Sequence, residues 1–257
     1  MKSFHEYIAE AQSIESGSKL AKRGFEFEKQ LIAAYVQLNR RPAEFVNICR
    51  DMDELVLKEF KKKSIKSIEE NKKIFKTPSG GLPKADISFN YVFDDDTTGT
   101  YSFSLKTTSA KRVSVHQGTV QQFLKALNLP EDNEDYQILK KGLEQFNIDG
   151  SWKGIKQWDK KEQDKFKSKL DSVLDNIARY VMSTGNGGTA ADAIILFNPD
   201  PIAPKYTVMS DREYLAKCKE MSASMKGMGG IFSYTYPHKQ KGKQIQLKIP
   251  VILTKSM

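Results

Sequence analysis

The sequence predicts a single α/β domain over residues 15–257, preceded by a short leader over residues 1–14. Three patterns support this class: two alternating stretches around a turn-forming run, apolar stripes at helical spacing, and a short apolar run suited to a buried strand. They occupy residues 83–108, residues 18–38 with 159–182, and residues 193–197, respectively. A chain of 257 residues without internal repeats or a low-complexity linker favours one packed core.

Local signals predict the other elements. Pro42 suits the first turn of a helix, Pro130 separates two helical stretches, and Asp159 with Glu162 resembles a capping box at the start of a long helix. A glycine-rich turn at 185–188 precedes the apolar run. In chain order we expect helices over residues 18–38, 42–60, 119–127, 135–146, 159–182 and 211–218, with further strands over residues 230–236 and 244–253.

The charge of the chain favours a polyanionic partner. The net charge is +9 and the pI is about 9.3. From residue 203 onward, ten basic residues stand against three acidic ones, an excess of seven positive charges. A basic but merely soluble surface would give the same numbers, although a one-signed segment on a folded domain more often binds nucleic acid.

Other function classes lack their sequence signals. The two cysteines are isolated and no secretory signal is present, so we expect a cytoplasmic protein without disulfides. No apolar run approaches the ~20 residues that span a membrane, so we expect no membrane partner. The three histidines form no cluster with cysteine, and no phosphate-binding loop motif appears, which argues against a zinc site, a serine protease triad and a P-loop nucleotidase.

The predicted hairpin brings a carboxylate and an ammonium to one face. Alternation places Asp86 on the polar face of the first strand, and Ser104 and Lys106 on the polar face of the second. Folding about a turn near residues 96–97 would set Asp86 opposite residues 106–108. This layout can hold a divalent metal on a phosphodiester with a water beside it. A cross-strand salt bridge is the simpler alternative.

Segments around this pair extend the hypothesis. Glu28 lies beside the apolar stripe of the first long helix, either as an edge carboxylate paired with lysine or as an extra metal or water ligand. The glycine- and proline-rich loop over residues 77–84 is suited to lie against a large ligand. Residues 107–117, which follow Lys106, are rich in hydroxyl and basic groups, as phosphate contacts require.

Five segments, in order along the chain, resemble the HinP-type and MspI-like restriction endonucleases of the PD-(D/E)XK nuclease superfamily. Each segment is short, and their shared order and spacing carry the resemblance. They are GSKLAKRGFEFEK (17–29), ADI (85–87), KTTSAKR (106–112), GNGGTAADAIILF (185–197) and IQLKIP (245–250). The resemblance implies a restriction-endonuclease-like fold, with a central mixed β-sheet flanked by helices, and it makes residues 15–257 a single nuclease domain.

The resemblance also assigns roles to residues. It implies that Asp86 binds the metal, that Lys106 stands near the attacking water, and that Glu28 is the helix glutamate. The superfamily usually carries Asp or Glu two positions before the lysine, and the HinP-type and MspI-like enzymes carry an amide there. This chain has Ser104, a hydroxyl that can coordinate a hard cation but brings no charge. The expected DNA contacts are Ser109, Lys111, Arg112, His116, Gln117, Lys239, Lys241 and Lys243. The stretch over residues 113–117 differs from the family's base-reading residues, so the recognition sequence does not transfer.

The leader has a separate resemblance. MKSFHEYIAEA is similar to capsid-targeting peptides on internal head proteins of T-even-type phages, which a prohead protease cuts after a Glu preceded two positions earlier by Ile or Leu. Ile8-Ala9-Glu10 before Ala11 fits that pattern. The resemblance implies a protein of the host cytoplasm that is also packaged in the phage head. An ordinary N-terminal docking helix is the alternative.

These observations predict a type II restriction-like endonuclease acting on double-stranded DNA as a monomer or weak dimer. The resemblance implies Mg²⁺ as cofactor, replaceable by Mn²⁺, and products with 5′-phosphate and 3′-hydroxyl ends. Two alternatives stay open. One is a phage-packaged nuclease that is non-specific or structure-specific, and the other is a catalytically inactive DNA-binding protein on a nuclease fold, which Ser104 would permit.

Overall fold

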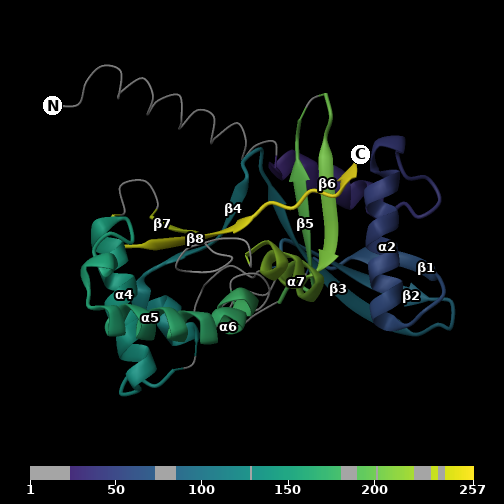
Figure 1. Ribbon diagram of the computed structural model, residues 1–257. Coiled ribbons are helices and arrows are strands. Elements are labelled where there is room, and N and C mark those ends of the chain that lie inside the picture. The colour runs from purple at the N-terminus through teal and green to yellow at the C-terminus, as the bar shows by residue number, and fades with distance from the viewer. Residues whose placement is uncertain are drawn as a thin grey trace.

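Two β-sheets and the helices around them form the molecule (Figure 1). The computed structural model describes residues 24–72, 85–127, 129–180, 190–200, 202–222, 233–236 and 241–257. The leader therefore lies outside the described residues. Within the described ranges, the predicted class is confirmed: a mixed central sheet is flanked by helices. No helix in these ranges is both long enough and apolar enough to cross a membrane.

The central sheet has six strands in the described part of the chain, in the order β1-β2-β3-β5-β6-β9. They are β1 (Ile65–Glu70), β2 (Ile87–Phe93), β3 (Thr98–Thr107), β5 (Ala193–Asn198), β6 (Lys205–Ser210) and β9 (Lys255–Ser256). Only β3 and β5 are parallel, and the other neighbours pair antiparallel. Residues 101–105 of β3 are all buried, which marks β3 as the central strand of the fold.

The outermost strand β9 is held by a buried carboxylate. Asp51, which is 6 % exposed at its side chain, accepts hydrogen bonds from the Tyr206 hydroxyl at 2.9 Å and from the Lys255 ammonium at 2.6 Å. Buried charges are tolerated when they are paired and hydrogen-bonded, as this one is. The contact fixes β9 against β6 and the helix that carries Asp51.

A smaller antiparallel sheet lies beside the central one, in the order β4-β8-β7. Its strands are β4 (Arg112–Gly118), β8 (Ile245–Pro250) and β7 (Ser233–Thr235). Because β4 follows β3 after a short turn, the second sheet begins within a few residues of Lys106. Along β8, Ile245, Leu247 and Ile249 are buried while Gln246 and Lys248 are partly exposed, so one face is apolar and the other polar.

Helices cover both faces of the central sheet. A helix over residues 24–35 and α2 pack on one face, and α3 to α7 with the second sheet form the core on the other. The bounds are α2 (Val46–Phe60), α3 (Val120–Ala126), α4 (Glu134–Asp149), α5 (Lys160–Ser172), α6 (Leu174–Arg179) and α7 (Asp211–Ser222), with short 3₁₀ turns at Ala43–Phe45 and Ile155–Gln157.

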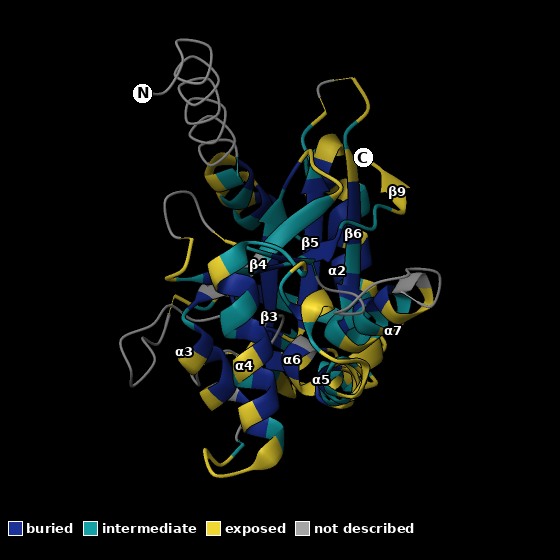
Figure 2. Cartoon of the chain, turned by 60° about the vertical axis from the view of Figure 1, so that its left-hand side comes forward, coloured by how far each residue is buried: buried dark blue, intermediate teal, exposed yellow. Residues whose placement is uncertain are grey.

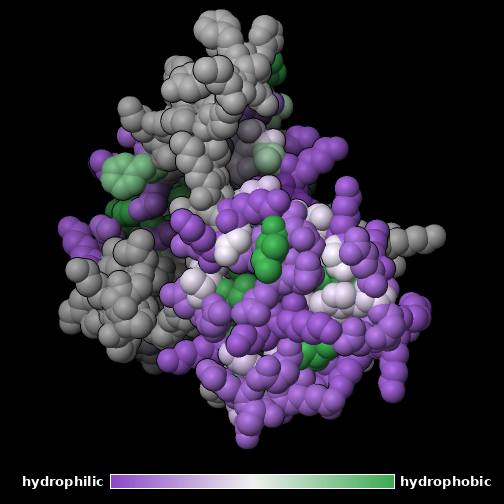
Figure 3. Space-filling model, turned by 90° about the vertical axis from the view of Figure 1, so that its left-hand side faces the viewer, coloured by the Kyte–Doolittle hydropathy of each residue, from purple (hydrophilic) through white to green (hydrophobic). Residues whose placement is uncertain are grey.

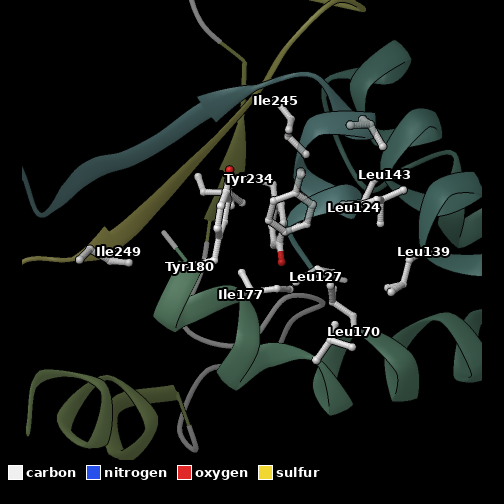
Figure 4. Close-up of a cluster of buried hydrophobic side chains, with 14 of the residues drawn as sticks. Leu124, Leu127, Leu139, Leu143, Leu170, Ile177, Tyr180, Tyr234, Ile245 and Ile249 are labelled. Carbon is white, nitrogen blue, oxygen red and sulfur yellow. The ribbon is translucent and has the colours of Figure 1, made fainter. Parts of the chain in front are cut away.

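The two cores differ in composition. The core under the helix over residues 24–35 is rich in aromatic rings from β2 and β3. The other core gathers leucine and isoleucine side chains from α3 to α6 around Tyr180, Tyr234 and the apolar face of β8 (Figure 4). Figure 2 shows the strands β3 and β5 largely buried between these layers. The side of the molecule that carries α4 and α5 is mostly hydrophilic at its surface (Figure 3).

The predicted hairpin exists, but its register was predicted wrongly. Ile87 pairs with Phe103, so Asp86 lies level with Ser104 rather than with residues 106–108. The turn is responsible: Asp95 accepts hydrogen bonds from the Thr97 amide and hydroxyl, and Asp96 adopts a left-handed φ of 60°. The hairpin is centred on residue 95 rather than between residues 96 and 97, so every cross-strand partner shifts by three residues.

The other predictions for the helices and strands hold with exceptions. The helix expected over residues 159–182 is interrupted at Val173, where φ is −99° and ψ is 4°, and a second short helix, α6, follows. Val173 and Ile177, on either side of the break, both lie in the core. Strands β1, β4, β6 and β9 were not predicted. The start of the first long helix lies outside the described residues.

Candidate active site

The candidate site lies at the end of the central sheet where β2 begins. The backbone amide of Asp86 donates to the carbonyl oxygen of Phe103 at 2.9 Å, which continues the β2–β3 ladder. The Asp86 carboxylate stands beyond the last pair of that ladder. Strand β2 begins only at Ile87, so β3 extends past it. The Asp86 carboxylate takes the position at which the backbone of β2 would otherwise pair with the next residues of β3.

Three donors from β3 converge on one oxygen of this carboxylate. The Leu105 amide lies 2.6 Å from Oδ2 of Asp86, the Lys106 ammonium 2.9 Å and the Ser104 hydroxyl 3.1 Å. Hydrogen bonds to an ionised acceptor are shorter and stronger than neutral ones. They fix the orientation of the carboxylate, and all three use Oδ2.

The observed register differs from the predicted one, but Asp86 and Lys106 still form an ion pair. Ser104, which is 2 % exposed, is the direct cross-strand neighbour of Asp86, and Lys106 reaches back along β3. The side chains of Lys106 and Asp86 remain 24 % and 32 % exposed, so the pair is open to a ligand at its outer side. The structure therefore brings Asp86, Ser104 and Lys106 together.

Glu28 joins the site from the helix over residues 24–35. That helix is anchored to the sheet by Phe27, whose ring stacks on Phe197 at 3.7 Å, and by a close approach of Gly24 to Thr107. Burial raises the pKa of the Glu28 carboxyl, the charge of Asp86 raises it further, and Lys106 partly lowers it. The two carboxylates are thus close enough to repel each other in a partly desolvated place.

The donor set at this position fits a hard divalent cation. Two carboxylates and one hydroxyl offer only oxygen atoms, which Mg²⁺ and Mn²⁺ prefer, and a cation would relieve the repulsion between Glu28 and Asp86. In the described ranges no three acidic, histidine or cysteine side chains gather into a complete cage. Mg²⁺ often binds one or two carboxylates and fills its other positions with water and phosphate oxygens.

The predicted DNA contacts are placed in part. Ser109 and Lys111 are exposed in the turn between β3 and β4, Arg112 begins β4, and Lys241 and Lys243 are exposed in the segment before β8. The backbones of His116 and Gln117 pair with β8, but their side chains lie outside the description. Lys239 lies outside the described residues altogether.

The polar face of the second sheet adds residues that the sequence reasoning missed. Ser114 of β4 and Ser233 of β7 both pair with Lys248 of β8. Gln246 accepts a hydrogen bond from the Thr235 hydroxyl at 3.1 Å. Alternation in IQLKIP was a sufficient signal for Gln246 and Lys248, because polar and apolar residues alternate there with a period of two.

Comparisons with known proteins show the family of the chain and agree with its fold. The model of the family described as restriction endonuclease MspI matches residues 6–249. The crystal structure of restriction endonuclease MspI in complex with its cognate DNA superposes with a TM-score of 0.68 at 17 % sequence identity, covering 91 % of this chain and 92 % of that one. A search of curated protein sequences gives no significant match.

The oxygen donor set predicts metal binding without DNA. Mn²⁺ or Mg²⁺ should raise the melting temperature of the protein, since a ligand at ten times its Kd stabilises the folded state by about 1.4 kcal/mol. Asp86→Asn should lose this shift and Ser104→Ala should reduce it, whereas Asp94→Asn, the same exchange in the hairpin turn, should retain it. The check is differential scanning calorimetry with and without metal. Equal shifts in all four proteins would place the metal elsewhere.

Proposed function

Because the chain belongs to the MspI restriction endonuclease family, we propose that it is a metal-dependent, type II site-specific endonuclease that hydrolyses double-stranded DNA to 5′-phosphate and 3′-hydroxyl ends. The observation that carries this proposal is the convergence of three β3 donors on one oxygen of Asp86. An ion pair that served only the stability of the sheet would not need a second, repelling carboxylate from Glu28.

In this proposal Asp86, with Glu28 and Ser104, would hold Mg²⁺ or Mn²⁺. When bound, the metal supplies positive charge at the phosphate and lowers the pKa of a water. The Leu105 amide and the Ser104 hydroxyl keep the Asp86 carboxylate in one orientation. Lys106, held 2.9 Å from Asp86, orients the attacking water and stabilises the charge that develops on the phosphate oxygens.

The DNA is proposed to contact the turn after β3 and the polar face of the second sheet. Lys111, Arg112, Lys241 and Lys243 supply cations for phosphates, and Ser109 supplies a hydroxyl. Gln246 and Lys248 join His116 and Gln117 as candidates for contacts to base edges, because a β-ribbon fits the major groove. This division separates the chemistry at the end of the central sheet from the binding of DNA on the second sheet.

We also propose that residues 1–10 are a removable capsid-targeting leader, on the basis of Ile8-Ala9-Glu10 before Ala11. Deleting residues 1–10 should leave the free energy of unfolding and the cleavage rate of the purified protein unchanged, because the segments that resemble the nucleases begin at Gly17 and the deletion removes only five of the residues that the family model matches. N-terminal sequencing of the protein from phage particles should find chains that start at Ala11. A deletion variant that unfolds would instead make residues 1–10 part of the core.

Site variants test the catalytic assignment. Asp86→Asn and Lys106→Ala should lower the cleavage rate about a thousandfold or more, since the first removes the carboxylate proposed to hold the metal and the second removes a positive charge beside the reacting phosphate. Both should keep wild-type DNA affinity in the absence of cleavage, measured by fluorescence anisotropy. The control Asp94→Asn should cut normally, and EDTA should silence the wild type.

The fragment pattern separates the proposal from its alternatives. A site-specific enzyme gives discrete fragments from a phage genome, and sequencing their ends gives the recognition site. A smear would indicate a non-specific or structure-specific nuclease. Metal-independent binding without any nicking of plasmid DNA would indicate an inactive DNA-binding protein. In that case Ser104→Glu would be the first variant to test for a gain of metal-dependent cleavage, because it adds a charged ligand.

Salt dependence tests the DNA surface. Replacing Lys239, Lys241 and Lys243 by Ala should reduce the slope of log K against log salt by up to about three, if each lysine contacts one phosphate. The matched control replaces three exposed lysines of α5, namely Lys160, Lys161 and Lys167, and should leave the slope unchanged. An unchanged slope in the first variant would place the β7–β8 turn away from the DNA.

A further inference from the structure

The last turn of α4 packs against β7, on the apolar face of the second sheet (Figure 1). The ring of Phe146 in that turn lies 6.1 Å from the ring of Tyr234 in β7, edge to face. The ring of Trp152, which follows the helix, lies 5.1 Å from Tyr234 in the same kind of arrangement. Tyr234 is buried and pairs with Leu247 of the apolar face of β8. The end of α4 and the second sheet therefore share one core.

The same end of α4 bonds to the basic segment over residues 241–243, which precedes β8. Carbonyl groups in the last turn of a helix have no partner within it. One of them, the carbonyl of Asn147, accepts a hydrogen bond from the Gly242 amide at 3.0 Å. Lys241 and Lys243, on either side of Gly242, are exposed. The helix end thus fixes the backbone between two lysines that are proposed to contact phosphates.

Gly150 determines how closely these two parts approach each other. It caps α4 with a left-handed φ of 68°, which glycine adopts without strain. A Cβ atom at this position would lie 2.5 Å from Cε1 of Tyr236 and 3.3 Å from Cε of Lys241, the atom that bears the ammonium. Carbon atoms in contact are normally about 3.5–4.0 Å apart. Any other residue would therefore push the Tyr236 ring or the Lys241 side chain away from the helix end.

We propose that the C-terminal end of α4 positions Lys241 and Lys243 for DNA phosphates, with Gly150 as a positioning residue for DNA binding. The inference rests on the proposed DNA surface, in which these two lysines supply cations. A lysine on an unsupported segment loses much conformational freedom when it meets a phosphate. Here the Asn147–Gly242 hydrogen bond and the close approach of Lys241 to Gly150 restrict the segment before DNA binds.

Gly150→Ala tests this inference through the salt dependence of DNA binding. The probe is a double-stranded DNA of random sequence in EDTA, and binding is measured by fluorescence anisotropy. We expect the slope of log K against log salt to fall by about one to two, since each lost phosphate contact removes about 0.9. Adding Tyr236→Leu should restore the slope, because leucine lacks the ring atom that the new methyl group meets.

The matched control is Ile138→Val, a core substitution near the other end of α4. It should lower the melting temperature by about 3 °C and leave the slope unchanged, because it touches no part of the basic segment. If Gly150→Ala does not fold, Gly150→Asn carries the same Cβ atom on a residue that tolerates a left-handed φ.

A folded Gly150 variant with the wild-type slope would overturn the inference alone, when the variant that lacks Lys239, Lys241 and Lys243 does show a reduced slope. A wild-type slope in that lysine variant would overturn the proposed DNA surface and the inference together. A reduced slope in Ile138→Val would also count against the inference, because loss of stability would then explain the effect. So would a slope that Tyr236→Leu fails to restore, because the added atom would then act elsewhere.

Discussion

Strand β3 has to pair with a neighbour on each side, and the two neighbours run in opposite directions. It pairs antiparallel with β2 and parallel with β5, and its residues 101–105 are buried on both faces. Because β2 begins at Ile87, the Leu105 amide has no residue of β2 left to bond and takes the Asp86 carboxylate instead. The candidate site is thus a consequence of unequal strand lengths, since an unpaired buried amide would be costly.

The sequence was informative where side chains alternate and weak where backbone geometry decides. Alternation in β2 and β3 predicted which residues face the core, and it brought Asp86, Ser104 and Lys106 to one face. It did not predict the register, because the conformations of Asp95 and Asp96 set the turn. Strand β1 was missed because an edge strand can carry lysine and glutamate, and IKSIEE therefore shows little of the expected pattern.

Ser104 alters the electrostatics of the candidate site. An Asp or Glu at this position would be a further negative charge beside Asp86, buried to nearly the same degree. The hydroxyl instead donates to Asp86. Glu28, whose carboxyl is affected by the charges of Asp86, Lys106 and Glu70, therefore matters more to the charge of the site. The helix over residues 24–35 consequently has a larger role than a covering element, because it carries Glu28. Its attachment through Phe27 and Gly24 fixes where that charge lies.

The Lys255–Asp51 contact has a consequence for the order of folding. Its partners are 204 residues apart in the chain, and the contact closes the side of the sheet opposite β1. Closing so long a loop is entropically costly, and contacts of this range slow folding. During synthesis, α2 and the β2–β3 hairpin emerge long before β5, β6 and β9, so early intermediates expose the edge of β3 that β5 later covers. Newly synthesised chains therefore expose, for a time, the unpaired backbone edge of β3, which chaperones can bind.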